Sequence, residues 1–561
     1  MANKLELTWV GKNEEVNIEP RLLIENKELS NVANDENTEN KIIHGDNLLA
    51  LKALESKYAG KIKCIYIDPP YNTGSAFEHY DDNLEHSTWL QLMYERILLL
   101  YNLLDEDGVF CCQIDDSESS YLKIILDEIF GRQNYLNTFY IQVRYGNKTL
   151  AEDSDYQKII EQCHVYSKVK NKAKLNRPKV EYGIDNFCWK IVEKSSGKEI
   201  ELGNKKVIIF QNDEYEIKKI EPSLTGLKET WATGSLSRVK ASAGEFFELY
   251  LSGRKELDGL GCLYKVYGIG EDGLGYRYIS GPKKLTASKG KFYSGIPINR
   301  LEELKKGVSY RYVPVVNFSD FSASFGNCRL EGGVGFKGGK KPEVLIKMLL
   351  DYYTNEGDLI LDSFLGSGTT CAVAHKMGRK YIGIEMGEHA YTHCKVRLDK
   401  VIAGTDKGGI TESVGWTGGG AYRFYELAPT LIKKDEDGIE VINEEYNADM
   451  LAAAVAIHEG YTYEPDKNIF WKQSKSNEHS YLYVTTNFVD EKYLKNIFNN
   501  MDKDDYLIVV CTNYKKECDN LFKNIKLKKI PKSLLDKCEF DKDNYNLNII
   551  NPPIYDEEES T

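Results

Sequence analysis

The chain has 561 residues, which is too long for one compact domain and suggests two to four domains. With 42% hydrophobic and 28% charged residues it can bury sizeable cores, and no apolar run approaches the roughly eighteen residues of a membrane span. The first residues also lack the basic-then-apolar layout of a signal peptide. The twelve cysteines are scattered without a CxxC pair, which predicts buried thiols in a reducing cytoplasm.

The net charge of −13 is distributed unevenly along the chain. Residues 171–330 hold 27 lysines and arginines against 19 acidic residues, a local balance of +8 that leaves −21 for the rest. A positive segment between acidic ends suits a region that grips a nucleic-acid backbone. On charge alone, a lysine-rich solvated surface stays open as the alternative.

In chain order, residues 1–40 are predicted to be an N-terminal segment whose polar part, residues 25–40, is a linker. Residues 41–170 have an α/β pattern, in which short apolar runs of strand length alternate with helical periodicity. The expected elements are a strand ending at Asp46, a helix at 47–58, a strand at 63–68, a helix at 89–104 and a strand at 109–115. Strand, helix and strand at this spacing form a βαβ unit.

The composition changes over residues 171–330, where glycine, lysine, tyrosine and serine dominate and long helical periodicity disappears. Residues 331–430 return to the α/β pattern, and residues 431–561 form a last, small α/β stretch. The fold class predicted is therefore α/β. One Rossmann-like sheet is encoded in two halves and interrupted by a mixed α+β insert, and a C-terminal domain follows.

The first candidate site is Asp68-Pro69-Pro70-Tyr71, at the end of the apolar run KCIYID. A carboxylate and a prolyl carbonyl can each accept a hydrogen from an amine and so direct its lone pair outward. The prolines fix φ, so the acceptors are preorganised, and Tyr71 offers a flat face for stacking. An ordinary turn after a strand is the competing interpretation.

The second candidate site is the stretch Asp362 to Thr370, DSFLGSGTT, between a predicted strand and a predicted helix. Glycines at such a turn let the backbone approach a ligand, with the helix N-terminus behind it. Glu385 ends the next strand, where an α/β nucleotide site places an acid for ribose hydroxyls. A phosphate-binding loop is the rival interpretation, but its GK[ST] ending is missing.

Together these motifs resemble those of the amino-methyltransferase family, which transfers a methyl group from S-adenosylmethionine to an exocyclic amine. The resemblance assigns the catalytic pocket to Asp68, Pro69, Pro70 and Tyr71. It assigns S-adenosylmethionine binding to Asp46, Lys341, Pro342, Asp362, Phe364, Gly366, Ser367, Gly368, Thr369 and Glu385. It implies no metal.

The order of the motifs adds to the resemblance, since the acidic tetrapeptide precedes the glycine loop and the basic insert lies between them. This looks like the β arrangement of the family, whose gap holds the target-recognition domain. Residues 5–430 are similar to modification (Mod) subunits of type III restriction–modification systems. The resemblance implies methylation of adenine N6 in double-stranded DNA by base flipping, a homodimer and a restriction (Res) subunit as possible partner.

Three alternatives stay open. Methylation of cytosine N4 uses similar geometry, a DNA-binding assembly subunit would be catalytically silent, and RNA is a possible substrate. The Pro-Cys nucleophile of C5-cytosine methylation is absent from the sequence. Asn551-Pro552-Pro553-Ile554 imitates the catalytic tetrapeptide but lacks an aromatic residue, and the spacing of His389, His393 and Cys394 favours a helix face over a zinc site.

Overall fold

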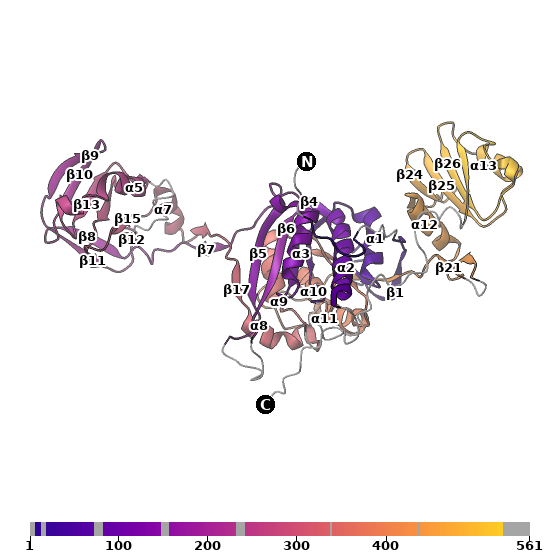
Figure 1. Ribbon diagram of the computed structural model, residues 1–561, viewed down its shortest axis with the longest axis horizontal. Coiled ribbons are helices and arrows are strands. Elements are labelled where there is room, and N and C mark those ends of the chain that lie inside the picture. Colours follow the sequence, from indigo (N-terminus) through magenta and orange to yellow (C-terminus); the bar gives the residue numbers. More distant parts are fainter. Residues whose placement is uncertain are drawn as a thin grey trace, which may run out of the picture. The chain divides into compact units, whose positions relative to one another are not determined.

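The computed structural model describes residues 6–12, 18–71, 82–146, 156–231, 242–336, 339–434 and 438–530. The chain divides into two compact units (Figure 1). One unit joins Met1–Asn176 to Val316–Thr561, and the other is Arg177–Val315.

A ten-stranded sheet forms the centre of the first unit. Its spatial order is β1 (Leu23–Asn31), β20 (Tyr422–Leu427), β2 (Lys41–His44), β19 (Lys380–Glu385), β18 (Leu359–Asp362), β3 (Ile62–Ile67), β4 (Leu104–Ile114), β6 (Ile160–Ser167), β5 (Tyr135–Gln142) and β17 (Phe318–Asp320). The strands from β20 to β4 are all parallel, as expected when helices connect them. Both sequence halves contribute to this sheet, and the predicted α/β fold is confirmed.

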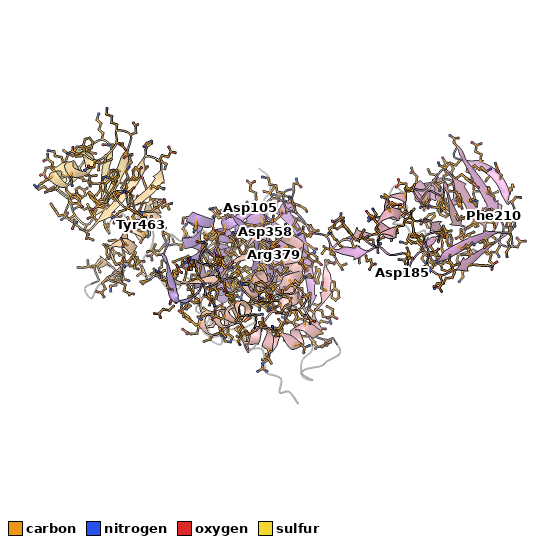
Figure 2. The ribbon with its side chains drawn as sticks, turned by 180° about the vertical axis from the view of Figure 1, so that it is seen from behind. Asp105, Asp185, Phe210, Asp358, Arg379 and Tyr463 are labelled. Carbon is orange, nitrogen blue, oxygen red and sulfur yellow. The ribbon has the colours of Figure 1, made fainter. Side chains whose placement is uncertain are left out.

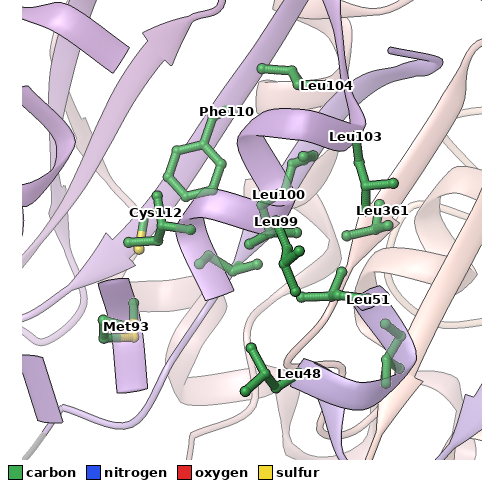
Figure 3. Packing of buried hydrophobic residues seen from close by; sticks show 14 of the residues in the cluster. Leu48, Leu51, Met93, Leu99, Leu100, Leu103, Leu104, Phe110, Cys112 and Leu361 are labelled. Atoms are coloured by element: carbon green, nitrogen blue, oxygen red, sulfur yellow. The ribbon is translucent and has the colours of Figure 1, made fainter. Parts of the chain in front are cut away.

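Two groups of helices cover the sheet. The first group is α1 (Asn47–Tyr58), α2 (Asp82–Leu103) and α3 (Ser119–Leu126), and the second is α9 (Glu343–Tyr353), α10 (Thr369–Lys376) and α11 (Val396–Ile402). Leu48 and Leu51 of α1 pack with Met93 and Leu100 of α2 and with Phe110 of β4 (Figure 3). Side chains alternate across a strand, so neighbours of Phe110 such as Cys111 face the other side of the sheet, where they interact with Tyr353 of α9.

The connections leave β18 and β3 in opposite directions. From β18 the chain passes through α10 to β19 on one side, whereas from β3 it passes through α2 to β4 on the other. Such a switch point between adjacent parallel strands is where open α/β sheets bind ligands, at the carboxyl ends of the strands. The two candidate motifs follow these two strands.

The prediction of a linker over residues 25–40 is wrong for its first part. Strand β1 pairs antiparallel with β20, with Leu23 opposite Leu427 and Asn26 opposite Phe424. Its polar composition has a physical reason, because β1 is an edge strand whose side chains are mostly half-buried or exposed. The partner strand lies some four hundred residues further along the chain, so local sequence carries no signal for the pairing.

The second unit is built on an antiparallel sheet with a core of its own (Figure 2 labels Phe210 and Asp185 in it). The sheet order is β12 (Lys228–Trp231), β15 (Lys291–Ser294), β14 (Tyr276–Ser280), β13 (Leu263–Tyr267), β10 (Lys205–Phe210) and β9 (Lys198–Leu202). Smaller elements are β7 (Lys179–Glu181), β8 (Trp189–Glu193), β11 (Tyr215–Lys219), β16 (Tyr310–Tyr312), α5 (Ser242–Phe246), α6 (Lys255–Asp258) and α7 (Ile298–Lys305). This mixed α+β composition agrees with the texture predicted for residues 171–330. Strand β17 and helix α8 (Ser322–Asn327), at the end of that range, belong to the first unit.

The C-terminal stretch has α/β structure as predicted. Its five-stranded sheet contains β23 (Thr462–Tyr463), β24 (Ser474–Asn477), β25 (Ser480–Thr485), β26 (Tyr506–Cys511) and β27 (Ile525–Lys529), and its helices are α12 (Ala448–Glu459) and α13 (Glu491–Phe498). A hairpin of β21 (Ile432–Lys434) and β22 (Glu440–Ile442) precedes it. Residues 551–554 lie outside the described residues. In the part of the chain that the structure describes, no helix is long and apolar enough to cross a membrane.

Candidate active site

Asp68 and Asp362 lie at the carboxyl ends of adjacent parallel strands. The register pairs Leu361 of β18 with Ile65 of β3, so the chain leaves both strands at the same edge of the sheet. The like charge of Asp68 contributes to a raised pKa of Asp362, so the two carboxylates interact electrostatically. The structure thus brings together the two motifs that are almost three hundred residues apart in sequence.

Tyr71 and Lys341 hold Asp68 from two sides. The Tyr71 hydroxyl donates to Asp68 Oδ1 at 2.7 Å, and Lys341 Nζ lies 3.0 Å from Asp68 Oδ2. Lys341 Nζ also donates to the Tyr71 hydroxyl at 2.9 Å. A second carboxylate joins them, because Glu161 Oε2 accepts from the Tyr71 hydroxyl at 2.9 Å and lies 3.4 Å from Lys341 Nζ.

Burial is the largest influence on Asp68 and raises the pKa of its carboxyl. The ammonium of Lys341 acts in the opposite direction, and the like charge of Glu161 adds to the rise. The backbone after Asp68 is fixed as well, since Trp89 Nε1 donates to the Pro70 carbonyl at 2.8 Å. Among the described residues, no backbone N–H donates to the Pro69 carbonyl.

The glycine loop after β18 is closed by Glu385. The backbone N–H of Gly366 donates to Glu385 Oε2 at 2.7 Å, and that of Gly387 donates to Oε1 at 3.0 Å. Gly366 has φ +56°, and Gly368 has φ +78° immediately before helix α10, both in the region that favours glycine. Among the described residues, only the Phe336 ring comes near a Cβ built on Gly366, at 3.9 Å, so these residues leave the backbone accessible on that side.

Asp362 stabilises the same loop from inside. Its Oδ1 accepts from the backbone N–H of Phe364 at 2.9 Å, and its Oδ2 accepts from the Thr370 hydroxyl at 2.6 Å. Burial raises the pKa of Asp362 to about 7, although these hydrogen bonds oppose the rise.

A fully buried ion cluster supports the loop from behind. Glu343 at the start of α9 pairs with Lys376 of α10 and Arg397 of α11, both at 2.8 Å, and none of the three side chains is exposed. Arg397 then donates to the Thr369 hydroxyl at 2.7 Å and to the Ser367 carbonyl at 3.3 Å. Because removing one partner of a buried pair costs about 3–5 kcal/mol, this cluster fixes the loop strongly.

Asp46 caps helix α1, with Oδ1 accepting from the Leu49 N–H at 3.0 Å. Its other oxygen lies 3.4 Å from the guanidinium of the fully buried Arg96. Arg96 also donates to Asn47, whose side-chain amide donates to the Ser363 carbonyl at 2.8 Å. The Ser363 hydroxyl is buried and has no hydrogen-bond partner among the described residues.

The predicted residues thus lie in two groups at one sheet edge. Lys341 lies with the tetrapeptide, because its ammonium contacts Asp68, Tyr71 and Glu161, and Pro342 precedes the first turn of α9. The prediction that Lys341 and Pro342 bind S-adenosylmethionine stays a prediction. So do the donor contacts of Asp46 and of the loop residues, and the stacking of Tyr71, whose side chain is almost fully buried.

Sequence reasoning missed Glu161 and its partner Gln113. Gln113 lies on β4, which pairs with β3, and Glu161 lies on β6, the next strand of the sheet. Gln113 accepts from the Tyr66 hydroxyl at 2.8 Å and donates to Glu161 Oε2. A polar residue inside the apolar run VFCCQID is a usable signal for Gln113, since a buried amide needs partners. Glu161 has no such signal, because it lies at the polar start of its strand.

A switch point in an open α/β sheet, a glycine loop and two neighbouring carboxylates are the features with which enzymes of this architecture bind nucleotide-like ligands. The model of the DNA methylase family (N6_N4_Mtase) matches residues 62–395, a range that contains both motifs. The chain belongs to this family.

Three relatives are similar over much of the chain. The probable type III restriction–modification enzyme HindVI Mod subunit of Haemophilus influenzae is 32% identical over 83% of this chain and 66% of its own length. The EcoPI Mod subunit of Escherichia phage P1 is 29% identical over 67% of this chain and 62% of its own length. The EcoP15I Mod subunit of Escherichia coli is 25% identical over 79% of this chain and 74% of its own length. The chain therefore spans just under two thirds of the length of the first two relatives.

Proposed function

We propose that the chain is the modification subunit of a type III restriction–modification system and transfers a methyl group from S-adenosylmethionine to N6 of adenine in double-stranded DNA. The observation that carries this proposal is the position of Asp68, which directly follows β3 beside the glycine loop that follows β18. Similarity to three Mod subunits supports the type III assignment.

The residues at the sheet edge fit S-adenosylmethionine. The Gly366 backbone is accessible where a ligand would approach, the buried Ser363 hydroxyl lacks a described partner, and Glu385 ends β19 where ribose hydroxyls are bound in α/β sites. The loop residues and Glu385 would hold the molecule, and Asp46 would lie near its adenine ring. When bound, it supplies an electrophilic methyl group attached to a sulfonium.

The chain's own contribution is to prepare and orient the target amine. The lone pair of the adenine amine is delocalised into the ring, which makes the amine a weak nucleophile. Hydrogen bonds from the amine to the Asp68 carboxylate and the Pro69 carbonyl would favour a pyramidal nitrogen with its lone pair directed outward. Orientation of this kind can contribute roughly 7–11 kcal/mol. A base inside a duplex cannot reach these acceptors, so the target adenine must flip out.

The basic middle segment, residues 171–330, would read the DNA sequence, while the sheet carries the chemistry. The compact unit Arg177–Val315 supports this division, because it has its own hydrophobic core. A Res subunit with helicase and nuclease activity is the partner that a type III system requires, and the cytoplasm is the compartment that the cysteine content predicts.

Incubation of the purified chain with double-stranded DNA and methyl-labelled S-adenosylmethionine tests the proposal. Nuclease digestion and mass spectrometry of the nucleosides should yield N6-methyladenine. N4-methylcytosine would instead assign the runner-up activity, label in RNA alone would change the substrate class, and no label in any nucleic acid would leave a silent assembly subunit. Methylation-sensitive sequencing of host DNA would then give the recognition site.

Replacing Gly366 by valine should weaken S-adenosylmethionine binding at least about tenfold, which corresponds to about 1.4 kcal/mol. A β-branched residue at φ +56° is strained, and its side chain would occupy the side from which a ligand approaches the backbone. Calorimetry with the donor measures the effect. Gly357→Val is the matched control, since Gly357 has φ +84° with open space around it and lies before β18. Wild-type affinity in a folded Gly366→Val variant would show that the loop does not bind the donor.

We also expect a homodimer in solution, because the Mod subunits that the sequence resembles act as dimers on asymmetric sites. Light scattering at working concentrations, with and without DNA, measures the mass against 64.0 kDa for one chain. A monomer under both conditions would contradict this expectation.

A further inference from the structure

A second carboxylate, that of Glu161, shares both partners of Asp68, namely Tyr71 and Lys341. Glu161 comes from β6, which is separated from β3 by strand β4. Tyr71 and Lys341 each lie within hydrogen-bond or ion-pair distance of both carboxylates. The side chains are largely shielded from solvent, with 6% of Lys341, 12% of Glu161 and 19% of Asp68 exposed.

The Tyr71 hydroxyl forms a bridge with two alternative states. A phenol has one hydrogen, and Asp68 Oδ1 at 2.7 Å and Glu161 Oε2 at 2.9 Å both accept from it, so it can donate fully to one of them at a time. Lys341 donates to the same oxygen at 2.9 Å. A proton that arrives on Asp68 can therefore pass to the phenol oxygen while the phenol hydrogen moves to Glu161.

The charges favour such a transfer. When all are ionised, Asp68, Glu161 and Lys341 carry one more negative than positive charge, so the group can take up one proton without becoming cationic. Two carboxylates near each other are more stable when one of them is protonated. Gln113 donates to the same oxygen of Glu161 and fixes that side chain toward the bridge.

We propose that Glu161 receives the proton that Asp68 removes from the target amine, that the Tyr71 hydroxyl carries it across, and that Lys341 holds the two carboxylates in place. The inference rests on the proposed methyl transfer. The amine nitrogen bonds to the methyl carbon as that carbon's bond to sulfur breaks, and the bonding pair stays on sulfur. The nitrogen, now with one bond too many, loses a proton to Asp68. Asp68 and Tyr71 end as they began, and the net movement is one proton from nitrogen to Glu161.

This arrangement gives Glu161 and Lys341 positioning and relay roles, and it gives Tyr71 a role through its hydroxyl. The Tyr71 side chain is 4% exposed, and the Lys341 ammonium lies 5.1 Å from the centre of its ring. Tyr71→Phe retains the ring and removes only the bridge, so it separates the relay from a stacking function.

The test is the single-turnover methylation rate of a preformed complex of enzyme, DNA and S-adenosylmethionine. Glu161→Gln and Tyr71→Phe should each lower this rate about 100-fold, at the lower end of what positioned proton transfer contributes. The double variant should be no slower than either single variant, because both changes interrupt one path. Affinities for DNA and S-adenosylmethionine should stay within about twofold of wild type.

Asp127→Asn is the matched control. Asp127 is also a carboxylate that accepts from a tyrosine, Tyr166 at 2.6 Å, and pairs with a lysine, Lys123 at 2.8 Å, but it lies away from the tetrapeptide. The Asp127→Asn variant should retain the wild-type rate. That result would show that loss of a tyrosine–carboxylate–lysine contact does not by itself lower the methylation rate.

The pH profile supplies a readout that a purely structural role would not move. Among the described residues, the ionisable groups that interact with Asp68 or Glu161 are Lys341, Tyr71, Tyr66, Asp362 and Cys112. Because the charge of Glu161 contributes to the raised pKa of Asp68, its removal should move the acid limb of the rate profile to lower pH even as the rate falls.

Each outcome is informative. A Glu161→Gln variant with the wild-type rate and acid limb overturns the relay, and so does a double variant whose loss is the product of the single losses. If Glu161→Gln does not fold, the Tyr71→Phe variant decides by its rate alone. A wild-type chain that methylates no DNA contradicts the proposed function itself, which is a different result from a relay variant that remains active.

Discussion

Asp68→Ala should lower the methylation rate by about a thousandfold or more while S-adenosylmethionine still binds with near wild-type affinity. The reason is the division of the site into two groups, with Asp68 among the residues after β3 and the donor loop after β18. Loss of one preorganised hydrogen-bonding group at a reacting atom typically costs about 100- to 1000-fold, and Asp68 would also accept the amine proton. Single-turnover rates and calorimetry with the donor measure the two properties separately.

Two further variants sharpen this test. Asp127→Ala makes the same change at a carboxylate held by Tyr166 and Lys123 and should leave the rate unchanged. Asp68→Asn retains the shape of the side chain and one acceptor oxygen, so its methylation rate should fall less than that of Asp68→Ala. Loss of donor affinity together with activity in Asp68→Ala would contradict the assignment of Asp68 to the base.

The same residue predicts how the rate depends on pH. Burial raises the pKa of Asp68, and the acceptor must be ionised, so activity should be lost as the pH falls through that raised value. Asp68→Asn has no carboxyl to titrate at this position. Its residual rate should therefore lack the acid limb that the wild-type enzyme shows.

The parts of the site that the sequence predicted are those whose residues are neighbours in the chain. Asp68 to Tyr71 and Asp362 to Thr370 each follow one strand, and parallel neighbours place both loops at one edge. The contacts across strands were not predictable in the same way. Glu161 reaches Tyr71 from a strand ninety positions further on, and nothing in its own surroundings distinguishes it from a solvated glutamate at a strand end.

The fold shows the same difference between elements that local sequence predicts and elements that depend on distant partners. Helix α1 has the bounds that were predicted for it, and the Asp46 side chain caps its N-terminus. Helix α2 begins at Asp82, earlier than predicted, and β1 was taken for a linker. An edge strand has only one partner and one buried face, so its sequence lacks the apolar density by which β3 was recognised.

Exchange of the compact unit Arg177–Val315 for the corresponding segment of a relative with a different target should move methylation to that relative's sequence. The unit has its own antiparallel sheet and core, so it can be replaced without removing strands from the catalytic sheet. Cutting at 171 and 330 instead would remove β17, which pairs with β5. Methylation-sensitive sequencing gives the motif, and calorimetry should show unchanged donor affinity. A chimera that retains the original motif would place recognition elsewhere, most plausibly in residues 430–561.

Within this unit, Lys283 and Lys284 should contribute to DNA affinity without setting the sequence. Both side chains are exposed. By contrast, Lys289 pairs with Glu248 at 2.5 Å, and Lys291 pairs with Glu229 at 2.6 Å. The Lys291 ammonium also lies 4.5 Å from the centre of the Trp231 ring. Changing Lys283 and Lys284 to glutamine should weaken binding to all sequences and lower the slope of log affinity against log salt by about one per lysine. The matched pair Lys289→Gln and Lys291→Gln removes equal charge where carboxylates already compensate it, and should change the slope less. Equal slopes for the two double variants would mean that net charge alone, and not the exposed pair, determines the affinity for the phosphate backbone.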